Sequence, residues 1–430
     1  MTVVHSFQNY ISRESLSGVV LFLSTMLAVW VANSSLGQAY YDLWRVALGI
    51  NIGELSISMT LTDWINDGLM ALFFLMVGLE IKREIVVGDL SSVKKASFPI
   101  FAAIGGMVVP ALIYIALNPN NPLGFGIPMA TDIAFSLGVL MLLGKRVSSS
   151  VKLFLVTLAV VDDLGAVIVV ASVYTDELQY AYLMHVTIVY LLIWMLNLNG
   201  VKSLIPYLIL GVFLWIYIHN IGVHATIAGV LLAFAIPIKS KIKEKEFVKK
   251  TKKFLAKFET NIDKKPIIND DQIDALEHIS YGYDKVQNPL LRLEHNLHGF
   301  SAFVIMPLFA FSNAGVVLDF SYVSANIMIV LGVFFGLLIG KPLGIFGFTY
   351  YAAKLKLIKL PKHISWNEVL AIGFIGGIGF TMSVFITHLA FLDESIIAAV
   401  KIGVFLASFI ATIIGVYLLL KSNKLNDKSV

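Results

Sequence analysis

Cysteine is absent from this chain of 430 residues, and charged residues make up only 14% of it. The absence of cysteine excludes disulfides, thiolate metal sites and cysteine nucleophiles. A soluble domain usually carries about 25% charged residues, so the low charge excludes a soluble enzyme, a disordered protein and a nucleic-acid binder. The chain is instead rich in apolar residues, at 58%, and its mean hydropathy is +0.83. These values indicate a protein that lies in a membrane.

Long apolar runs, separated by charged or turn-rich breaks, predict twelve membrane spans, since one span needs about 20 apolar residues. Backbone groups cannot stay unpaired in lipid, so the spans are expected to be helices. The first run is too long, and preceded by too little positive charge, for a cleavable signal peptide. The expected spans are Leu16–Ala32, Trp64–Ile81, Ala96–Leu117, Phe125–Leu143, Leu153–Tyr174, Tyr180–Leu198, Leu204–Ile218, Val223–Ile238, Phe300–Leu318, Ile327–Ala352, Val369–Phe391 and Ile396–Leu420.

Lysine and arginine concentrate in alternate loops between these runs, as they do in the cytoplasmic loops of membrane proteins. The cation-rich loops hold Lys82, Arg83, Lys94, Lys95, Lys145, Arg146, Lys152, Lys202, the lysines from Lys239 onward, Lys354, Lys356, Lys359 and Lys362. The intervening loops hold Arg45, Asp176, Glu177, His219, Asp319, Asp393 and Glu394. An even number of spans with both termini inside follows. Lys401, near the outer end of the last span, is the exception and can reach the interface by snorkelling.

Two segments outside the spans have patterns of their own. Residues 55–62 alternate apolar and polar side chains after glycine-rich turn signals, which predicts a strand or hairpin outside the membrane. A lone hairpin is marginally stable in water, so pairing with a second protomer is expected. Residues 239–298 form the only long polar segment, lysine-rich at first and then acidic. This composition is typical of a cytoplasmic linker inserted in a single transporter domain; a basic amphipathic helix lying on anionic lipid is the alternative.

Few ionisable residues fall within the predicted spans. Placing such a side chain in the bilayer costs free energy, so the residues found there usually have a function. They are Asp67, Glu80, Asp132, Asp162, Asp163, His224 and Lys341. Asp162 and Asp163 lie about 100° apart on a helix, so one can face a cation path while the other faces a neighbouring helix. Burial and like charge both raise the affinity of a carboxylate for protons. Such a group holds either a proton or a metal cation, which is the physical requirement for exchange by competition.

Asp132 follows an interruption of the fourth span, where Gly126 and Pro128 break the helix and free backbone carbonyls. These carbonyls, the Thr131 hydroxyl and the carboxylate are hard oxygen ligands that suit a small alkali cation. The eleventh span has its own break at Gly373, Gly376, Gly377 and Gly379, although glycines also serve close helix packing. Spans three to five start inside and spans ten to twelve start outside, so the two triplets are expected to be inverted repeats. Paired broken helices at matching places of such repeats point to a transport site.

Lys341 is the only cation deep inside a predicted span. Pairing with Asp162 would neutralise it, whereas a buried lysine can also lose its proton. A structural ion pair beside a hydrogen-bonded acid is the alternative to a transport site, but three carboxylates in mid-membrane exceed what packing needs. Lys341 is therefore expected to be either a counter-ion or a proton carrier.

Taken together, the motifs resemble one family, the NhaA-type bacterial sodium/proton antiporters. They follow the family order across nearly the whole chain, at residues 64–67, 77–84, 128–135, 161–165, 222–226, 309–315, 340–344 and 376–383. That family is itself a known example of inverted repeats, so the topology above is not an independent inference. The resemblance implies an all-α polytopic membrane protein with twelve transmembrane helices, two inverted-topology repeats, broken crossing helices at spans four and eleven, and a small extracellular β-hairpin.

The resemblance also implies roles for individual residues. Asp163 and Asp132 would bind sodium or lithium in competition with protons, with Thr131 nearby, and Asp162 would pair with Lys341. Asp132 and Lys341 would offset the helix dipoles where the broken spans cross. Exchange would be electrogenic and pH-regulated. The remaining matches are the accessory acid Asp67, the pH-response positions Glu80, Arg83, Glu84, Arg292, Glu294 and His298, and His224, which is linked to pH response but equally compatible with a structural role.

The family further implies a multi-pass protein of the bacterial inner membrane, with cytoplasmic termini and a homodimer contact through the extracellular hairpin. No cofactor, catalytic residue or nucleic-acid partner is expected; the partners are sodium or lithium ions, protons and the lipid bilayer. One departure stands out: the family's better-known members have a short loop where this chain has its polar insertion before Arg292. An insertion beside Glu294 can shift or broaden the activation pH, which puts the sensor roles in doubt.

Three other functions compete with this interpretation. An intramembrane aspartyl protease also needs two membrane aspartates, but its usual Gly-x-Gly-Asp context is absent around Asp132, Asp162 and Asp163. A cation channel would use rings of carbonyls or carboxylates in a symmetric pore, whereas a single off-centre site with a lysine fits carriage. A proton-coupled carrier of an organic solute would need arginine clamps, and the small-cation ligand set argues against it.

Overall fold

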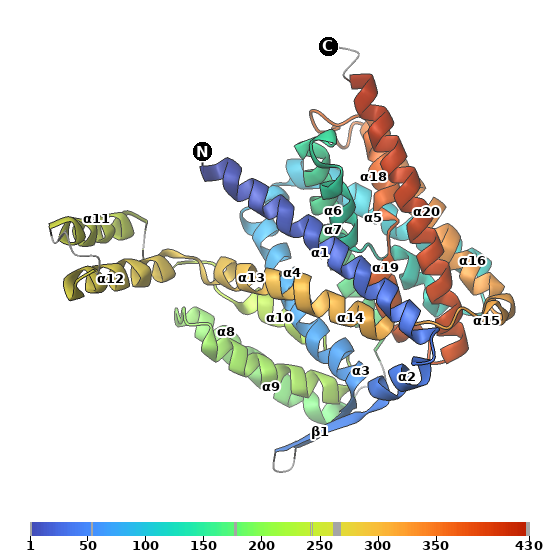
Figure 1. Cartoon of the computed structure of the whole chain (residues 1–430), viewed down its shortest axis with the longest axis horizontal. Coiled ribbons are helices and arrows are strands. Elements are labelled where there is room, and N and C mark those ends of the chain that lie inside the picture. Colours follow the sequence, from blue (N-terminus) through green and yellow to red (C-terminus); the bar gives the residue numbers. More distant parts are fainter. Residues whose placement is uncertain are drawn as a thin grey trace.

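The chain folds almost entirely into helices, with one β-hairpin at the end of the body opposite the chain termini (Figure 1). The structure is a computed structural model that describes residues 2–52, 55–175, 179–240, 242, 244–260 and 268–426. Some of the charged positions used to orient the chain, Asp176, Glu177, Lys241 and Lys428, lie outside the described residues, as do residues 261–267 of the polar insertion.

The first half of the chain contains several long helices, the hairpin and a number of shorter helical elements. Its elements are α1 (Thr2–Ala32), α2 (Gly37–Arg45), β1 (Ala47–Ile52), β2 (Leu55–Thr60), α3 (Leu61–Asp63), η1 (Trp64–Leu69), α4 (Met70–Val86), η2 (Asp89–Ser91), α5 (Val93–Leu117), η3 (Pro122–Met129), α6 (Ile133–Leu142), η4 (Gly144–Arg146), α7 (Ser149–Val173), η5 (Tyr180–Tyr182), α8 (Leu183–Leu198), α9 (Ile205–Ile221) and α10 (Ile227–Ala235).

The second half begins with the polar insertion and returns to apolar helices. Its elements are α11 (Glu244–Thr260), α12 (Asp270–Val286), α13 (Pro289–Phe300), η6 (Ser301–Ile305), α14 (Met306–Asn313), α15 (Phe320–Ala325), α16 (Ile327–Phe335), η7 (Gly336–Gly340), α17 (Lys341–Lys354), α18 (Trp366–Gly376), α19 (Phe380–Ala390) and α20 (Glu394–Asn426). Among the described residues, six helices are long and apolar enough to cross a membrane, and up to eight if each of two bent pairs is one span. Helices occupy every one of the twelve predicted ranges, but α10, with nine residues, is shorter than a bilayer. Helix α14 continues without a break from α13 through η6.

Two glycines allow α5 and α17 to cross at very short distance. A Cβ atom placed on Gly105 would lie 2.1 Å from the carbonyl oxygen of Gly344, and one on Gly344 would lie 2.0 Å from the carbonyl oxygen of Gly105. Next to this crossing, a Cβ on Gly106 would lie 3.7 Å from Cε of Lys341. Close helix contact through small residues is a common packing mode in membranes. Here it brings the start of α17, and with it Lys341, into the interior.

Two helical segments stop and restart in the middle of the body. The 3₁₀ helix η3 ends at Met129, and α6 begins at Ile133, capped by the side chain of Asp132. Helix α18 ends at Gly376, α19 begins at Phe380, and their axes are bent by 49°. Both interruptions expose backbone groups that regular helices would satisfy internally. The side chains that replace those bonds form the centre of the site described below.

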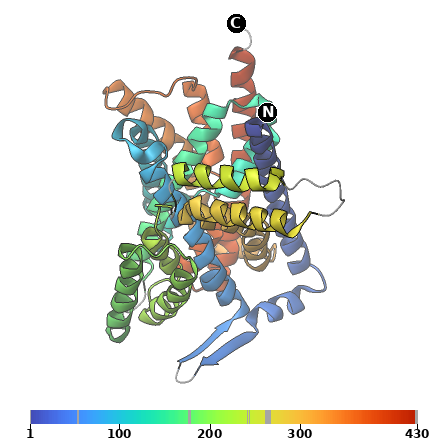
Figure 2. The ribbon, with the colours of Figure 1, turned by 90° about the vertical axis from the view of Figure 1, so that its left-hand side faces the viewer.

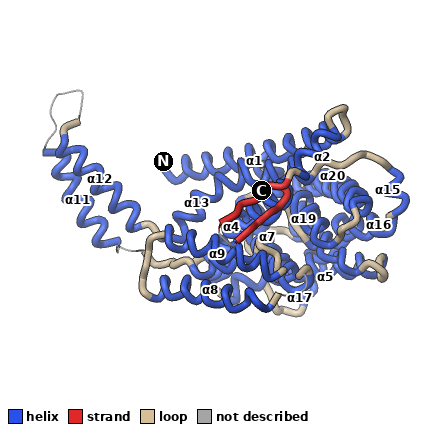
Figure 3. Tube along the Cα trace, turned by 90° about the horizontal axis from the view of Figure 1, so that it is seen from below, coloured by secondary structure: helices blue, strands red, loops and turns tan. Residues whose placement is uncertain are grey.

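The predicted hairpin is present on the face opposite the chain termini, where Figure 3 shows it lying over the helices. β1 and β2 pair antiparallel, with the register running from Ala47 opposite Thr60 to Ile52 opposite Leu55. The alternating pattern predicted a strand up to Thr62, but β2 ends at Thr60. The reason is a capping box: the hydroxyl of Thr60 accepts the backbone N–H of Asp63, whose carboxylate accepts the N–H of Thr60. The chain therefore turns directly into helix α3.

The polar insertion forms two helices, α11 and α12, that pack side by side and project from the body (Figures 1 and 2). The described residues of this expected linker form regular helices. The aromatic side of α11 faces α12: the Phe254 ring stacks on His278 at 4.5 Å, and Phe247 fits against Gly282. Lys257 joins the two helices through ion pairs of 3.3 and 3.0 Å with Asp271 and Asp274. The phenylalanines of the predicted amphipathic helix thus pack within the protein.

Candidate functional site

Three aspartates meet at the centre of the body with almost no exposure to solvent. Asp162 and Asp163 lie in the middle of α7, and each is 3% exposed; Asp132, between η3 and α6, is fully buried. Helix α7 is capped by Ser148, whose hydroxyl accepts the N–H of Val151. Adjacent positions on a helix point in different directions, and Asp162 and Asp163 accordingly have different surroundings.

Asp162 is held by a cation and a hydroxyl on the same oxygen. Its Oδ2 lies 2.6 Å from Nζ of Lys341 and 2.6 Å from Oγ1 of Thr131. The ammonium of Lys341 also donates to the carbonyl of Met129, the last residue of η3. Lys341 is fully buried, so this carboxylate supplies the opposite charge that a buried ammonium requires. The Oδ1 atom of Asp162 is buried and has no hydrogen-bond partner.

Asp132 joins the beginnings of two helices. Its Oδ1 accepts the backbone N–H of Phe135 in α6 at 2.9 Å, and its Oδ2 accepts both the backbone N–H, at 3.1 Å, and the hydroxyl of Thr381 in α19. Helix N-termini carry a partial positive charge, so a carboxylate placed at two of them is stabilised by both. The ammonium of Lys341 lies at the carbonyl end of η3 and has the complementary effect there.

Further polar contacts tie the two interruptions together. The backbone N–H of Asp132 donates to the carbonyl of Ile378 at 2.8 Å, and the Thr131 hydroxyl lies 3.0 Å from the carbonyl of Gly376. In the opposite direction, the Ser383 hydroxyl donates to the carbonyl of Ile127 at 2.8 Å. The carbonyls of Ile378 and Ile127 are thus each satisfied by the other interrupted segment. A change in the position of one segment would break bonds made by the other.

Asp163 lines a small inner cavity of about 70 Å³. Its Oδ2 atom is buried and has no hydrogen-bond partner. Thr131 and Asp132 line the same cavity, together with Glu80 and His298. The cavity therefore offers an unpaired carboxylate oxygen, a hydroxyl and a second carboxylate, which are the ligand types that a hard alkali cation prefers.

A second and much larger space adjoins the inner cavity, and we call it the vestibule. It has a volume of about 900 Å³ and lies between α4, α12 and α13. Three residues line both spaces, namely Met76, Glu80 and His298. The vestibule is also bordered by the base of the polar insertion, through Glu244 and Tyr283. The inner cavity is thus separated from the vestibule by a few side chains.

A charged cluster forms one wall of the vestibule. The guanidinium of Arg83 lies 2.9 Å from Glu294, 3.0 Å from Glu84 and 3.7 Å from Glu80. Burial raises the pKa of Glu294 in spite of the nearby arginine, and its Oε2 has no hydrogen-bond partner. Burial also lowers the pKa of His298, and His295 and Arg83 act in the same direction. Five of the predicted pH-response positions therefore lie close together beside the vestibule: Glu80, Arg83, Glu84, Glu294 and His298.

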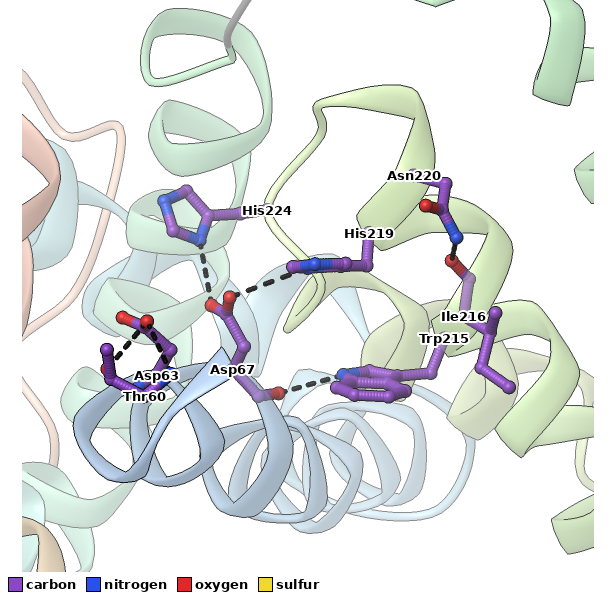
Figure 4. A network of polar contacts seen from close by, with 8 residues as sticks. All are labelled: Thr60, Asp63, Asp67, Trp215, Ile216, His219, Asn220 and His224. Atoms are coloured by element: carbon purple, nitrogen blue, oxygen red, sulfur yellow. Dashed lines mark hydrogen bonds and ion pairs between the residues drawn. The ribbon is translucent and has the colours of Figure 1, made fainter. Parts of the chain in front are cut away.

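Arg292 and His224 are placed differently from the rest of the predicted set. Arg292 is exposed at the edge of the vestibule. His224 lies near Asp67: its Nδ1 is 3.5 Å from Oδ1 of Asp67, while Nδ1 of His219 is 3.6 Å from Oδ2 of the same carboxylate (Figure 4). Trp215 completes this outer cluster by donating from its indole N–H to the backbone carbonyl of Asp67 at 2.9 Å.

The residues predicted from the sequence therefore form three groups: the central aspartates with Lys341, the charged cluster around Arg83 at the vestibule, and the outer cluster around Asp67. Sequence reasoning did not assign Thr381 or His219 to any site. Thr381 follows a glycine-rich break, which is the one signal in the chain that could have indicated its helix-start position. His219 has no local signal, because only the packing of α9 brings it to Asp67. Among the described residues, no group of three or more histidines, cysteines, aspartates or glutamates is arranged to hold a metal ion.

Over nearly its whole length, the sequence is similar to Na+/H+ antiporters. The family model described as Na+/H+ antiporter 1 matches residues 8–419. The chain is 65% identical to Na(+)/H(+) antiporter NhaA 1 of Aliarcobacter butzleri, over 96% of this chain and 95% of that one. It is 50% identical to Na(+)/H(+) antiporter NhaA of Helicobacter pylori strain 26695, over 97% and 96%. A solved sodium proton antiporter from Methanocaldococcus jannaschii is 14% identical, with a TM-score of 0.40, over 97% of this chain and all of that one.

Proposed function

The chain belongs to the Na+/H+ antiporter 1 family, and from this premise we propose that it exchanges sodium ions for protons across a membrane at Asp163 and Asp132. The family is one of transporters, and the chain is a multi-pass membrane protein. The observation that carries the assignment of the site is the unpaired Oδ2 of Asp163, buried in the wall of the inner cavity. Lithium, which has the same charge and preference for hard oxygen ligands, is a second substrate in this proposal.

Competition for the carboxylates couples the two ions. A buried, unpaired carboxylate is unstable as an anion and gains stability from either a proton or a metal ion. Asp163 in the inner cavity supplies one such group, and Asp132 and Thr131 supply further oxygen atoms on the same wall. When a sodium ion enters, the protons leave, and the reverse happens on the other side of the membrane. Exchange of more protons than sodium ions in each cycle would make it electrogenic.

Lys341 acts as the partner of Asp162 in the proposed cycle. The two groups share a contact of 2.6 Å in a fully buried setting, so the protonation of either one changes the charge balance at the site. As a counter-ion, Lys341 would stay charged throughout; as a proton carrier, it would release its proton when sodium binds. Lys341→His distinguishes these roles, because an altered pH profile with retained transport supports a titrating lysine, and an unchanged profile supports a counter-ion.

The proposed membrane topology has twelve spans. The interrupted segments η3–α6 and α18–α19 would be the broken crossing helices of two inverted repeats, at the middle of spans three to five and ten to twelve. Support comes from the reciprocal hydrogen bonds between the segments, such as Ser383 to Ile127 and Asp132 to Ile378. Both termini would be cytoplasmic, because the lysine-rich loops lie on their side of the protein, and the membrane would be the bacterial inner membrane.

We assign pH regulation to the cluster around Arg83. Glu80 and His298 line both the vestibule and the inner cavity, and Glu294 lines the vestibule, so their charge affects ions that approach from the cytoplasm. The polar insertion of residues 239–298 borders the same space and is proposed to be a cytoplasmic regulatory element. The hairpin of β1 and β2 is proposed to form a homodimer contact outside the membrane, because an isolated hairpin is only marginally stable.

Everted membrane vesicles provide the test of exchange. An acid interior is imposed, followed with a fluorescent pH probe, and sodium, lithium or potassium chloride is added. Dequenching by sodium and lithium, but not by potassium, is expected. The absence of any response to sodium and lithium from neutral to alkaline pH would refute the proposed exchange.

Variants then test the assigned site. Asp163→Asn should abolish exchange while the protein still reaches the membrane, because an amide neither titrates nor supplies a negative charge. Asp274→Asn is the matched control: Asp274 lies on the insertion and pairs with Lys257, so its loss should leave exchange intact. Near-normal exchange by Asp163→Asn, together with an active wild type, would remove Asp163 from the site without affecting the assignment of the family.

A further inference from the structure

A third cavity, which we call the outer cavity, lies on the hairpin side of the protein and shares no lining residue with the inner cavity. Its volume is about 750 Å³, and it lies among α2, α15, α19 and α20. Several nitrogen-bearing side chains line it, and those of Lys401 and His388 play no part in the exchange mechanism proposed above. They come from neighbouring helices, α20 and α19.

Lys401 does not snorkel to the membrane surface, contrary to the expectation from its place in the last span. The side chain is buried, with only 6% of the residue exposed, and it lies in the wall of the outer cavity. Within the described part of the chain, no carboxylate lies within ion-pair distance of its ammonium, and no hydrogen bond to it is formed. An ammonium that has lost most of its hydration and has no partner in the protein is poorly stabilised.

His388 presents a second unsatisfied nitrogen to the same region. Its Nε2 atom is buried and has no hydrogen-bond partner. A neutral imidazole can donate one N–H to a ligand, and an unpaired buried nitrogen of this kind is uncommon in folded proteins. With Lys401, and with Trp44, whose buried indole Nε1 also has no partner, the outer cavity has three donor side chains in its wall that the described protein does not satisfy.

The one carboxylate in the cavity wall is already paired elsewhere. Glu394 forms an ion pair of 2.8 Å with Arg45, and both side chains are largely exposed, at 83% and 61%. This pair lies at the solvent side of the cavity, so its opposite charges offset one another there. The uncompensated positive charge of the cavity is that of Lys401.

We propose that the outer cavity binds a small inorganic anion of single negative charge, with chloride as the physiological example, at Lys401 and His388. Such an anion would supply the missing charge for the ammonium and accept the N–H of His388. Its entry from the outside is possible because exposed residues such as Arg45 and Glu394 line the cavity mouth. The site is separate from cation exchange, which uses Asp163 and its neighbours.

The first test measures thermal unfolding of the purified full chain in detergent at constant sodium concentration, while gluconate is replaced by chloride. Gluconate is too large and polyhydroxylated to replace a small spherical anion. Chloride should raise the unfolding midpoint of the wild type in a saturable manner. Lys401→Met should lose this shift, and Lys401→Arg, which keeps the charge, should retain most of it. Lys354→Met, which removes an exposed lysine at the end of α17, is the matched control and should behave as the wild type.

The second test does not depend on how well the variants fold. Crystals of the wild-type protein grown with bromide in place of chloride should show anomalous scattering at Lys401 and His388. The absence of both the midpoint shift and the bromide peak would overturn the proposal and would indicate that Lys401 is uncharged in its cavity. A chloride shift that persists in Lys401→Met would also overturn it, since the anion would then bind elsewhere.

Discussion

The backbone N–H and the hydroxyl of Thr381 both donate to Oδ2 of Asp132, although 249 positions separate the two residues. The other oxygen of the same carboxylate accepts the N–H of Phe135. One buried side chain thus caps the helix that follows it and the helix that starts after the second interruption. The position of Asp132 depends on α19 as much as on its own segment.

Removal of this hydroxyl is expected to weaken the site. Thr381→Val keeps the shape of the side chain but leaves Oδ2 of Asp132 with the backbone donor alone, and a hydrogen bond to a charged group contributes about 1.5–3 kcal/mol. We expect a lower thermal unfolding midpoint in detergent and a higher KM for sodium. Thr381→Ser, which retains the hydroxyl, should stay near the wild type in both measurements. Equal behaviour of the valine and serine variants would mean that the hydroxyl is dispensable.

The ion pair of Lys341 and Asp162 leads to a rescue prediction. Lys341→Met leaves Asp162 as an unpaired buried carboxylate, and the loss of one partner of such a pair costs about 3–5 kcal/mol. The double variant Lys341→Met/Asp162→Asn removes both charges and should recover much of the unfolding midpoint. The two proteins would be compared by thermal unfolding in the same detergent. A double variant less stable than Lys341→Met would contradict the charge argument.

The crossing of α5 and α17 is expected to tolerate no added carbon. Gly105→Ala places a methyl group against the backbone of Gly344, a clash that helix movement must relieve, and overpacking of this kind costs about 1–3 kcal/mol. The control is Gly347→Ala on the partner helix α17, where a Cβ atom meets nothing within 4 Å. We expect reduced yield and a lower unfolding midpoint for Gly105→Ala alone. A similar effect in both variants would attribute the loss to helix propensity and not to the crossing.

The buried carboxyl of Glu294 should make stability depend on pH. Its pKa is raised from 4.5 by burial, so the folded protein holds this proton more tightly than the unfolded chain does. The contribution of Glu294 to the free energy of unfolding therefore falls as the pH rises above 4.5 through the raised pKa. Glu294→Gln cannot titrate and should flatten this part of the profile of unfolding midpoint against pH. The prediction fails if the wild type and the variant have parallel profiles.

Replacement of α11 and α12, residues 244–286, by a short glycine-serine linker tests the insertion. The two helices contact each other through Phe254 and His278 and border the vestibule through Glu244 and Tyr283. We expect retained exchange in everted vesicles with a shifted or broadened pH profile, because the surroundings of Glu294 change. A profile identical to that of the wild type would separate the insertion from regulation, and the loss of all exchange would make it part of the transport machinery.

Local rules were sufficient for much of the fold and of the central site. Apolar runs located the helices, and the interruption at Gly126 and Pro128 indicated the position of Asp132. The adjacency of Asp162 and Asp163 was enough to predict that the two carboxylates differ in their surroundings, because helix geometry fixes their directions. The pairing of Lys341 with Asp162 followed from the scarcity of buried cations. Each of these inferences needs only neighbouring residues or a single charge balance.

Features that depend on packing between distant segments could not be predicted in the same way. His219 and His224 reach one carboxylate because α9 lies against η1, which no local pattern records. Lys401 faces a cavity and not lipid, because α19 and α15 cover that side of α20. The insertion has a composition typical of a linker, yet Phe247 and Phe254 find partners on α12. In each case the contact depends on how distant segments pack in the tertiary structure, which can override the preference of the local sequence.

Met76, Glu80 and His298 form a wall common to the vestibule and the inner cavity. A bulky reagent fixed to that wall would close the inner cavity to ions on the vestibule side, for entry and exit alike, so exchange would stop in both directions while the other side stayed accessible. Since the native chain has no thiol, a cysteine introduced at Met76 would be its sole attachment point. Such a modified protein would be inhibited from the vestibule side alone.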